Sequence, residues 1–293
     1  MLSDLFIFEI YPMRKFLLPF LLLTAIAFHS CKPTEKTVAE KKENKVRPNY
    51  RATYTMYADL IHTQLEVTPM WKEHAVKGIA TITLKPHFYP TDSVVLDGRG
   101  FTINFVKYKK GSEFVPAVYS YDGKKINIHF PSAYSSSDTV TVQIDYLAEP
   151  EKIKEEGSQA IKSDRGMYFI DPDSVDDYRP TQLWTQGETE SNSGWFPTIE
   201  SPQQKMTQDV FITVDTAFTT VSNGLFISSE KNNDGKKTDH WRQTLPAAPY
   251  LTMIAVGDFA KITDHYKNLE VSYYVDPPYE KHARSIFGHT PEM

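Results

Sequence analysis

The sequence predicts a mainly β fold, built as an antiparallel sandwich or curved sheet and followed by a short helical segment. Short runs of residues alternate between apolar and polar side chains, which is the period of a strand with one buried face. Tyr and Phe, 17 of each, accompany many Val, Ile and Thr residues, and these side chains pack well on a pleated surface. Turn residues separate the runs at close spacing, and no long helical period lies between them.

Residues 1–31 have the order of a bacterial lipoprotein signal. Arg14 and Lys15 precede an apolar run from 16 to 28, and the single cysteine of the chain, Cys31, follows shortly after. That run of about 13 residues is shorter than the roughly 20 that cross a bilayer. We therefore expect lipidation at Cys31 and an exported chain, anchored to the membrane of the bacterial cell envelope on its periplasmic or outer face. A cleaved secretory signal and a retained anchor are the alternatives, and Met13 is an alternative start.

Residues 32–49 predict a charged, disordered linker, because they hold almost no apolar side chain to bury. A β domain is expected over residues 50–263, and the start of a truncated second domain over residues 264–293.

The formal net charge of −5 is small, and the charged residues are mixed in sign, without the basic footprint that phosphate binding leaves. No nucleic-acid partner is therefore expected.

Strands within the β domain are predicted from their alternation. Ile61, Leu65 and Val67 are expected on the buried face of one strand, with polar residues between them. Asp122-Gly123 and Asn223-Gly224 have the composition of tight turns. The strand candidates are residues 61–67, 78–84, 93–96, 102–106, 125–130, 139–146, 210–214, 241–245 and 250–256.

The pattern becomes helical near the carboxyl end. A helix is predicted over residues 279–287, where Ala283, Ile286 and Phe287 share an apolar face, and Gly288 follows as a stop signal. The Thr-Pro-Glu run at 290–292 then has the form of a second helix start, with Thr290 as the N-cap. Because a helix start alone buries nothing, these residues suggest a second domain that is interrupted.

One polar loop contains the most informative residues. Trp184-Thr185-Gln186-Gly187-Glu188 is followed by Trp195-Phe196-Pro197-Thr198-Ile199-Glu200-Ser201-Pro202 and then by Lys205. The residues alone allow two interpretations: a long connection packed by its own aromatic side chains, or a loop that faces a substrate.

This stretch resembles the conserved loop of the aminopeptidase N family of zinc-dependent gluzincin aminopeptidases. In that family a Thr-Gln-x-Glu element leads into an aromatic-Pro-x-x-acid-x-Pro element and a Lys at the next strand. Further matching elements, from Tyr54 onward, are Val94-Val95-Leu96-Asp97-Gly98, Thr102-Ile103, Val221-Ser222-Asn223-Gly224, Pro249-Tyr250-Leu251 and Val256-Gly257-Asp258-Phe259. The resemblance implies a saddle-shaped β domain that lies over a thermolysin-like catalytic domain.

The resemblance also implies two substrate-binding residues. Gln186 would line the pocket for the first side chain of a peptide, and Glu188 would bind the free α-amine of its N-terminus. That amine, with a pKa near 8, is largely charged at neutral pH, and a partly desolvated carboxylate binds it by a charge-assisted hydrogen bond. The sequence departs from the family at three positions: Glu200 replaces a usual Asp, Thr198 a common Cys, and Gly194 a frequent basic residue.

The zinc motif of the family is absent from residues 1–293. No His-Glu-x-x-His helix and no Gly-x-Met-Glu-Asn loop occur, and the nine His are scattered. We therefore expect no catalytic residue, no metal ligand and no bound zinc in this chain, zinc being the cofactor of the full-length parent. The chain by itself is predicted to be inactive.

The preferred hypothesis is the substrate-recognition portion of a zinc metalloaminopeptidase whose catalytic domain is missing from this sequence. Its partners would be a peptide N-terminus, a membrane reached through the lipid anchor, and that catalytic domain. An alternative is a non-enzymatic surface lipoprotein that uses the β domain to bind peptides or glycans. A carbohydrate-binding sandwich is a third hypothesis, based on Trp71, Trp184 and Trp195 as exposed aromatic side chains.

Overall fold

The computed structural model describes residues 55–154 and 164–293. The predicted signal, the lipidation site Cys31 and the linker at 32–49 lie outside the described residues. The described part is mainly β, as predicted, with several sheets and one short α-helix. No helix in residues 55–154 or 164–293 is both long enough and apolar enough to span a membrane.

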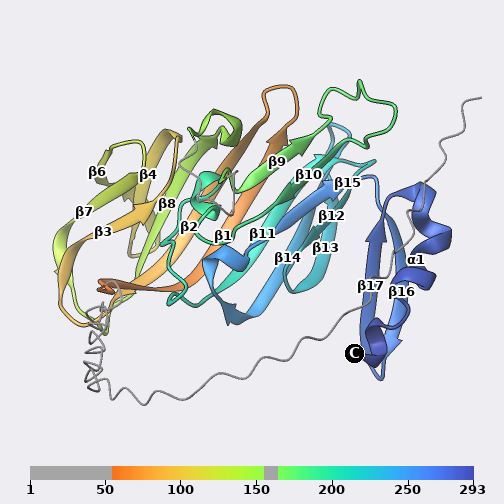
Figure 1. Ribbon diagram of the computed structural model, residues 1–293. Helices are drawn as coiled ribbons and strands as arrows, with labels where there is room; N and C mark the ends of the chain where they lie inside the picture. Colours follow the sequence, from red (N-terminus) through yellow and green to blue (C-terminus); the bar gives the residue numbers. More distant parts are fainter. Residues whose placement is uncertain (1–54, 155–163) are drawn as a thin grey trace, which may run out of the picture. The chain divides into compact units, whose positions relative to one another are not determined.

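The largest sheet has eight strands in the order β13-β14-β11-β1-β2-β8-β4-β5 (Figure 1). Neighbouring strands are antiparallel except β1 and β11, which run parallel and whose pairing joins the early and late parts of the domain. The strands are β1 (Ala58–Met70), β2 (Ala75–Pro86), β4 (Thr102–Lys110), β5 (Glu113–Pro116), β8 (Val140–Ala148), β11 (Met206–Asp215), β13 (Leu225–Lys231) and β14 (Lys236–Ala247).

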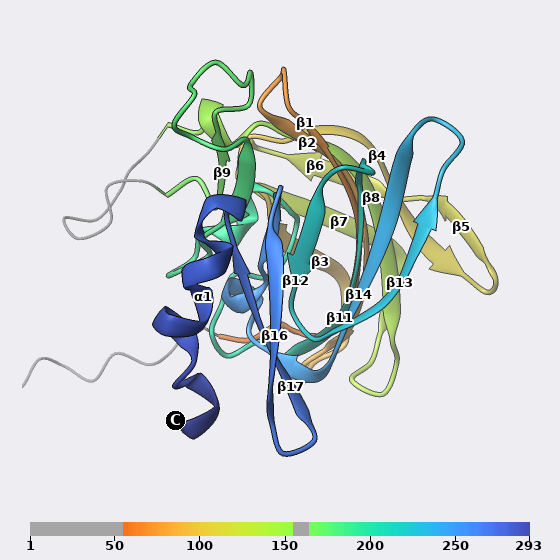
Figure 2. The ribbon, with the colours of Figure 1, turned by 90° about the vertical axis from the view of Figure 1, so that its right-hand side faces the viewer.

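Three smaller sheets complete the fold. Their strand orders are β3-β7-β6, β12-β15-β10-β9 and β16-β17, and Figure 2 shows α1 beside the β16–β17 hairpin. The strands are β3 (Thr91–Asp97), β6 (Val118–Tyr121), β7 (Lys125–Tyr134), β9 (Met167–Ile170), β10 (Gln182–Thr185), β12 (Thr219–Ser222), β15 (Ile254–Gly257), β16 (Ala260–Tyr266) and β17 (Leu269–Val275). The helices are α1 (Glu280–Phe287) and the 3₁₀ turns η1 (Pro150–Lys152), η2 (Asn192–Gly194), η3 (Pro249–Leu251), η4 (Pro277–Tyr279) and η5 (Thr290–Glu292).

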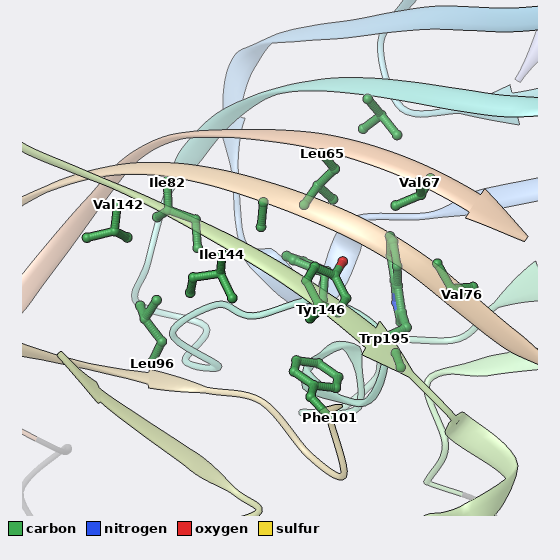
Figure 3. Close-up of a cluster of buried hydrophobic side chains, with 14 of the residues drawn as sticks. Leu65, Val67, Val76, Ile82, Leu96, Phe101, Val142, Ile144, Tyr146 and Trp195 are labelled. Atoms are coloured by element: carbon green, nitrogen blue, oxygen red, sulfur yellow. The ribbon is translucent and has the colours of Figure 1, made fainter. Parts of the chain in front are cut away.

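The core lies between the large sheet on one side and the three-stranded and four-stranded sheets on the other. Leu65, Ile82 and Ile144 project from β1, β2 and β8 towards Leu96 of β3, and all four are fully buried (Figure 3). Trp195, from the loop before β11, is also fully buried in this cluster, so its predicted exposure is wrong. Burial of these large apolar side chains is the main stabilising term of the fold.

A β-bulge changes the face of one predicted residue. The pairing of β1 with β2 shifts between Leu60 and His62, so Leu60 is buried and Ile61 is 37% exposed. Ile61 was expected on the buried face with Leu65 and Val67, and that expectation is wrong. A bulge adds one residue to the strand and reverses the alternation before it, which the period-two pattern cannot reveal.

The predicted turns are confirmed, whereas one strand is shorter than predicted. Gly123 and Gly224 occupy the left-handed region, with φ of 89° and 83°, in the turns before β7 and β13. The strand predicted over residues 250–256 is partly wrong, because η3 covers its first residues and β15 begins at Ile254.

The predicted helix is α1, but its continuation differs from the prediction. Of the three residues expected on its apolar face, Ala283 is buried as predicted, whereas Ile286 and Phe287 are 61% and 40% exposed. Thr290 is not an N-cap, since its hydroxyl donates a hydrogen bond to the carbonyl of Phe287 at 2.6 Å and η5 begins there. The domain boundary between 263 and 264 stays a prediction, and β16 runs across it.

Candidate functional site

Gln186, Gly187 and Glu188 begin the loop between β10 and β11. The backbone N–H of Gln186 donates to the carbonyl of Gly166 at 2.9 Å, and the side chains of Gln186 and Glu188 are both exposed. Gly187 between them is buried, and a Cβ there would lie 2.1 Å from the carbonyl oxygen of Tyr250. Only glycine fits this approach of two backbone segments, so Gly187 fixes the point from which Glu188 projects.

Asn192 attaches the loop to the residues around η3. Its Nδ2 donates hydrogen bonds to the carbonyls of Pro249 at 2.7 Å and Thr252 at 2.8 Å. Its Oδ1 accepts the indole N–H of the buried Trp195 at 2.8 Å. The amide of this fully buried side chain therefore uses both donors and its acceptor, which locks the loop that follows Glu188.

Glu200 binds the same loop from its other side. Its carboxylate accepts the backbone N–H groups of Asn192, at 3.0 Å, and of Ser193. Its own N–H donates to Oδ2 of Asp97 at 2.9 Å. Burial raises the pKa of Glu200 to about 7, because desolvation outweighs the hydrogen bonds from Ser193 and Asn192 and the attraction of Arg99, all of which lower it.

Arg99 joins the loop to Asp164. Its Nη1 donates to Oδ2 of Asp164 at 2.8 Å, and its Nη2 donates to the carbonyl of Ser191 at 3.1 Å. Its Nε donates to the hydroxyl of Ser193 at 3.1 Å. Arg99, Asn192 and Asp164 were missed by the sequence interpretation, because most of their side-chain partners lie far away along the chain and no local pattern marks them.

A cavity of about 910 Å³ lies beside these residues. Glu188 and Glu190 line it together with Arg99 and Glu200, whereas Gln186 does not. Its other walls are residues of β3, the segment 199–204 and residues 55–58 at the start of β1. Gln204 joins two of these walls, since its side chain accepts the N–H of Leu60 at 2.7 Å and donates to the carbonyl of Ala58 at 2.8 Å.

Within the part of the chain that the structure describes, no cation is bound to the carboxylate of Glu188. Among the described residues it forms no side-chain hydrogen bond and no ion pair, although Arg99 and Lys125 lie on the wall of the same cavity. Those two cations are bound to Asp164 and Asp97, respectively. The arrangement therefore leaves Glu188 able to accept a cationic group from a ligand.

The described residues also contain no group of three or more His, Cys, Asp or Glu side chains that could hold a metal ion. Zinc does not fit the described residues around this cavity, because no His or Cys lines it and three of its five acidic side chains, Asp97, Asp164 and Glu200, are bound to cations or to backbone N–H groups. No chemical step is therefore assigned to a metal here.

Similar structures include an M1 zinc metallopeptidase from Deinococcus radiodurans bound to a Tyr-Ser-Ala substrate, with 19% identity and a TM-score of 0.59. That similarity covers 74% of this chain and 47% of the other. Legionella pneumophila aminopeptidase A in complex with aspartic acid has 17% identity and a TM-score of 0.60, over 78% of this chain and 25% of the other. At these identities the similarity shows a shared fold.

Two curated relatives are the Transcription initiation factor TFIID subunit 2 proteins of Gallus gallus and Danio rerio. They are 30% and 32% identical to this chain over 126 and 127 residues, which is 41% of this chain in both cases. The matches cover 11% and 10% of those proteins, so this chain spans a small part of their length.

A family model described as the peptidase M1 N-terminal domain matches residues 47–251. This match agrees with the order of motifs around Glu188 and with the sheets described above. It covers well over half of the sequence, and the chain therefore belongs to the peptidase M1 N-terminal domain family.

Proposed function

We propose that this chain is the substrate-recognition portion of a zinc metalloaminopeptidase and that Glu188 binds the α-ammonium group of a peptide. The observation that supports this proposal is the position of Glu188, an exposed carboxylate on a cavity wall with no cation bound to it among the described residues. Gly187, Asn192 and Glu200 hold the backbone around it, so the carboxylate is positioned before a ligand arrives.

A carboxylate that binds an ammonium group at this position would select the amino-terminal end of a peptide. The charge exists only at a chain terminus, and an internal peptide bond cannot replace it in a charge-assisted hydrogen bond. Gln186, exposed two residues before Glu188, would contact the first side chain from outside the cavity wall. The structural neighbours with Tyr-Ser-Ala and aspartic acid bound support a ligand with a free amino terminus.

The zinc chemistry of such an enzyme would come from residues outside this sequence. Residues 1–293 lack the His-Glu-x-x-His motif, and the described residues form no metal-binding group. The role of this chain is then to bind and orient the peptide, and a catalytic domain would supply the zinc ligands and the hydrolysis. This division of roles predicts that the chain alone binds peptides weakly and does not cleave them.

A calorimetric titration of the purified chain with the tripeptide Tyr-Ser-Ala, free or acetylated at its amino terminus, tests the proposal. The free peptide should bind at least tenfold more tightly, because acetylation removes the charge that Glu188 would accept. Equal affinity for the two peptides, or cleavage of either one, would contradict the proposed role.

The similarity to TFIID subunit 2 favours a second candidate function. Those relatives are named as transcription initiation factors, so a domain of this family occurs in proteins that are not named as peptidases. On this hypothesis the chain is a surface binding module. Addition of a separately expressed M1 catalytic domain distinguishes the two candidates, since only a peptidase portion should gain aminoacyl-anilide hydrolysis.

We also propose that the chain is a lipoprotein anchored through Cys31 to the bacterial cell envelope. The order of charged residues, apolar run and cysteine in residues 13–31 supports this proposal. Expression in bacteria with a fatty acid that carries an alkyne label should label the wild-type protein and not the Cys31→Ser variant. Equal labelling of the two proteins would exclude lipidation at this residue.

A further inference from the structure

Strand β3 has one unpaired edge, and that edge faces the cavity. In its three-stranded sheet β3 pairs only with β7, so the opposite side of the strand is open. Residues along β3 from Thr91 to Asp97 line the cavity. At the end of the strand, Asp97 exchanges backbone hydrogen bonds with Thr198, at 2.6 and 3.0 Å, and this isolated bridge closes the edge there.

The backbone groups of Val95 point towards this open edge. In a strand, the N–H and C=O groups of residues two apart point to the same side. The N–H and C=O of Val95 therefore point to the same side as those of Asp97, away from β7. Ser93 is the next residue on that side, and both of its backbone groups already have a partner in the hydroxyl of Thr91. The hydroxyl accepts a hydrogen bond from the N–H of Ser93 at 3.2 Å and donates one to the carbonyl of Ser93 at 3.0 Å. Within residues 55–154 and 164–293, no hydrogen bond to the outward N–H or C=O of Val95 is found.

We propose that an extended peptide binds in the cavity as an additional strand on the open edge of β3, with Val95 as its main-chain partner. A donor and an acceptor held side by side on a fixed strand are the groups that a peptide backbone pairs with in β-augmentation. The cavity, about 910 Å³, is of the size that accommodates ligands of several residues. The inference goes beyond the proposed function, because pairing with Val95 requires no free amino terminus.

The side chains around the edge indicate the kind of peptide. Val95 is 47% exposed and offers an apolar contact to a side chain of the added strand. Five acidic and three basic side chains line the cavity, and the acidic ones outnumber the basic ones even when Glu200 is protonated, which favours a peptide with positive charge over an acidic one. The five acidic side chains are Asp97, Asp164, Glu188, Glu190 and Glu200, and the three basic ones are Arg99, Lys124 and Lys125.

The Val95→Pro variant tests this inference, because proline removes the outward N–H and leaves the hydrogen bonds of β3 with β7 in place. Val95→Ala is the matched control, since it shortens the same side chain and keeps the N–H. The probe is the hexapeptide Lys-Val-Thr-Val-Lys-Ala, amidated at its carboxyl end and prepared with a free or an acetylated amino terminus. We expect Val95→Pro to weaken binding of both forms at least fivefold relative to Val95→Ala.

N-methylation of single residues of the same peptide tests the pairing without changing the protein. Methylation should weaken binding to the wild type at alternate residues only, because every second N–H of an added strand points to β3. Equal binding by the two Val95 variants, or the same effect of methylation at every residue, would overturn the inference. If sedimentation instead shows that wild-type protein self-associates and Val95→Pro does not, the occupant of the edge is a second copy and the peptide proposal fails.

The two proposals fail in distinguishable ways. If Glu188→Gln keeps the preference for a free amine, or the wild type shows no such preference, while the Val95 difference is retained, the proposed function alone fails. A missing difference between the Val95 variants, with the amine preference intact, would remove the β3 pairing and leave the role of Glu188 untouched.

Discussion

The backbone N–H of Asn192 donates to Oε1 of Glu200 at 3.0 Å, which couples the loop that carries Glu188 to a buried carboxyl group. Burial raises the pKa of this carboxyl from 4.5 to about 7. The folded protein therefore holds a proton on Glu200 at pH values where the unfolded chain has released it. The resulting stabilisation is fully present below pH 4.5 and is lost as the pH rises through 7.

The Glu200→Gln variant should remove this pH dependence. Between pH 4.5 and 7.5, the free energy of unfolding of the wild type should fall relative to that of the variant, by at most about 3 kcal/mol for a shift of this size. Urea unfolding of both proteins at several pH values measures the difference, and the subtraction cancels the titration of other groups. A difference that does not change with pH would contradict the raised pKa of Glu200.

The Asn192→Asp variant should destabilise the protein by about 3 kcal/mol, because it keeps the shape of the side chain and removes both donors. The carbonyls of Pro249 and Thr252 would then face a carboxylate oxygen in a buried position. Asn104→Ala is the control, since it removes one hydrogen bond at the surface and should cost less than about 1 kcal/mol. Similar urea midpoints for the two variants would show that the amide of Asn192 does not fix the loop.

The Gly187→Ala variant should also be destabilised, by about 3 kcal/mol or more, because its Cβ would lie 2.1 Å from the carbonyl oxygen of Tyr250. Gly111→Asn provides the comparison: Gly111 has φ of 63°, a Cβ there meets nothing within 4 Å, and asparagine tolerates this backbone region. Thermal unfolding should show a large loss for the first variant and a small one for the second. Full stability of Gly187→Ala would mean that the two backbone segments are farther apart.

Thr198 is a buried residue whose hydroxyl has no hydrogen-bond partner among the described residues. The Thr198→Val variant should therefore be more stable than the wild type, by about 1 kcal/mol, because it removes an unsatisfied polar group at nearly constant volume. Thr220→Val is the opposite case, since its hydroxyl donates to Asp239 at 2.8 Å and accepts the indole N–H of Trp241 at 3.0 Å. That variant should lose about 2 kcal/mol in the same measurement. A loss of stability in both variants would indicate that Thr198 has a partner.

The strands could be predicted because each depends on local alternation. In β8, Val140, Val142, Ile144 and Tyr146 are buried and the residues between them are less so, as the period-two pattern predicts. Ile61 shows the limit of this reasoning, since the bulge beside it depends on the pairing of β1 with β2. The parallel pairing of β1 with β11 is likewise set by contacts between residues about 145 positions apart, such as His62 and Thr207.

The candidate site could be predicted only where a local motif marks it. Gln186 and Glu188 follow from the resemblance of their loop, and the structure locates Glu188 on the cavity wall and Gln186 outside it. Trp195 was misjudged because an aromatic residue in a polar loop carries no signal of its burial, which arises from packing against the core, while the hydrogen bond to Asn192 satisfies its buried indole N–H. The partners of Arg99, 65 and 92 residues away, could not be found in a single sequence.

The central claim is that Glu188 binds a peptide α-ammonium group, and six titrations test it most directly. The free and acetylated forms of Tyr-Ser-Ala are titrated into the wild type and into Glu188→Gln, with Glu190→Gln, another exposed acid of the same cavity, as the matched control. We predict a coupling free energy of about 1.5–3 kcal/mol between Glu188 and the amine, and less than about 0.5 kcal/mol for Glu190. A coupling near zero for Glu188, or an equal coupling for both acids, would contradict the account.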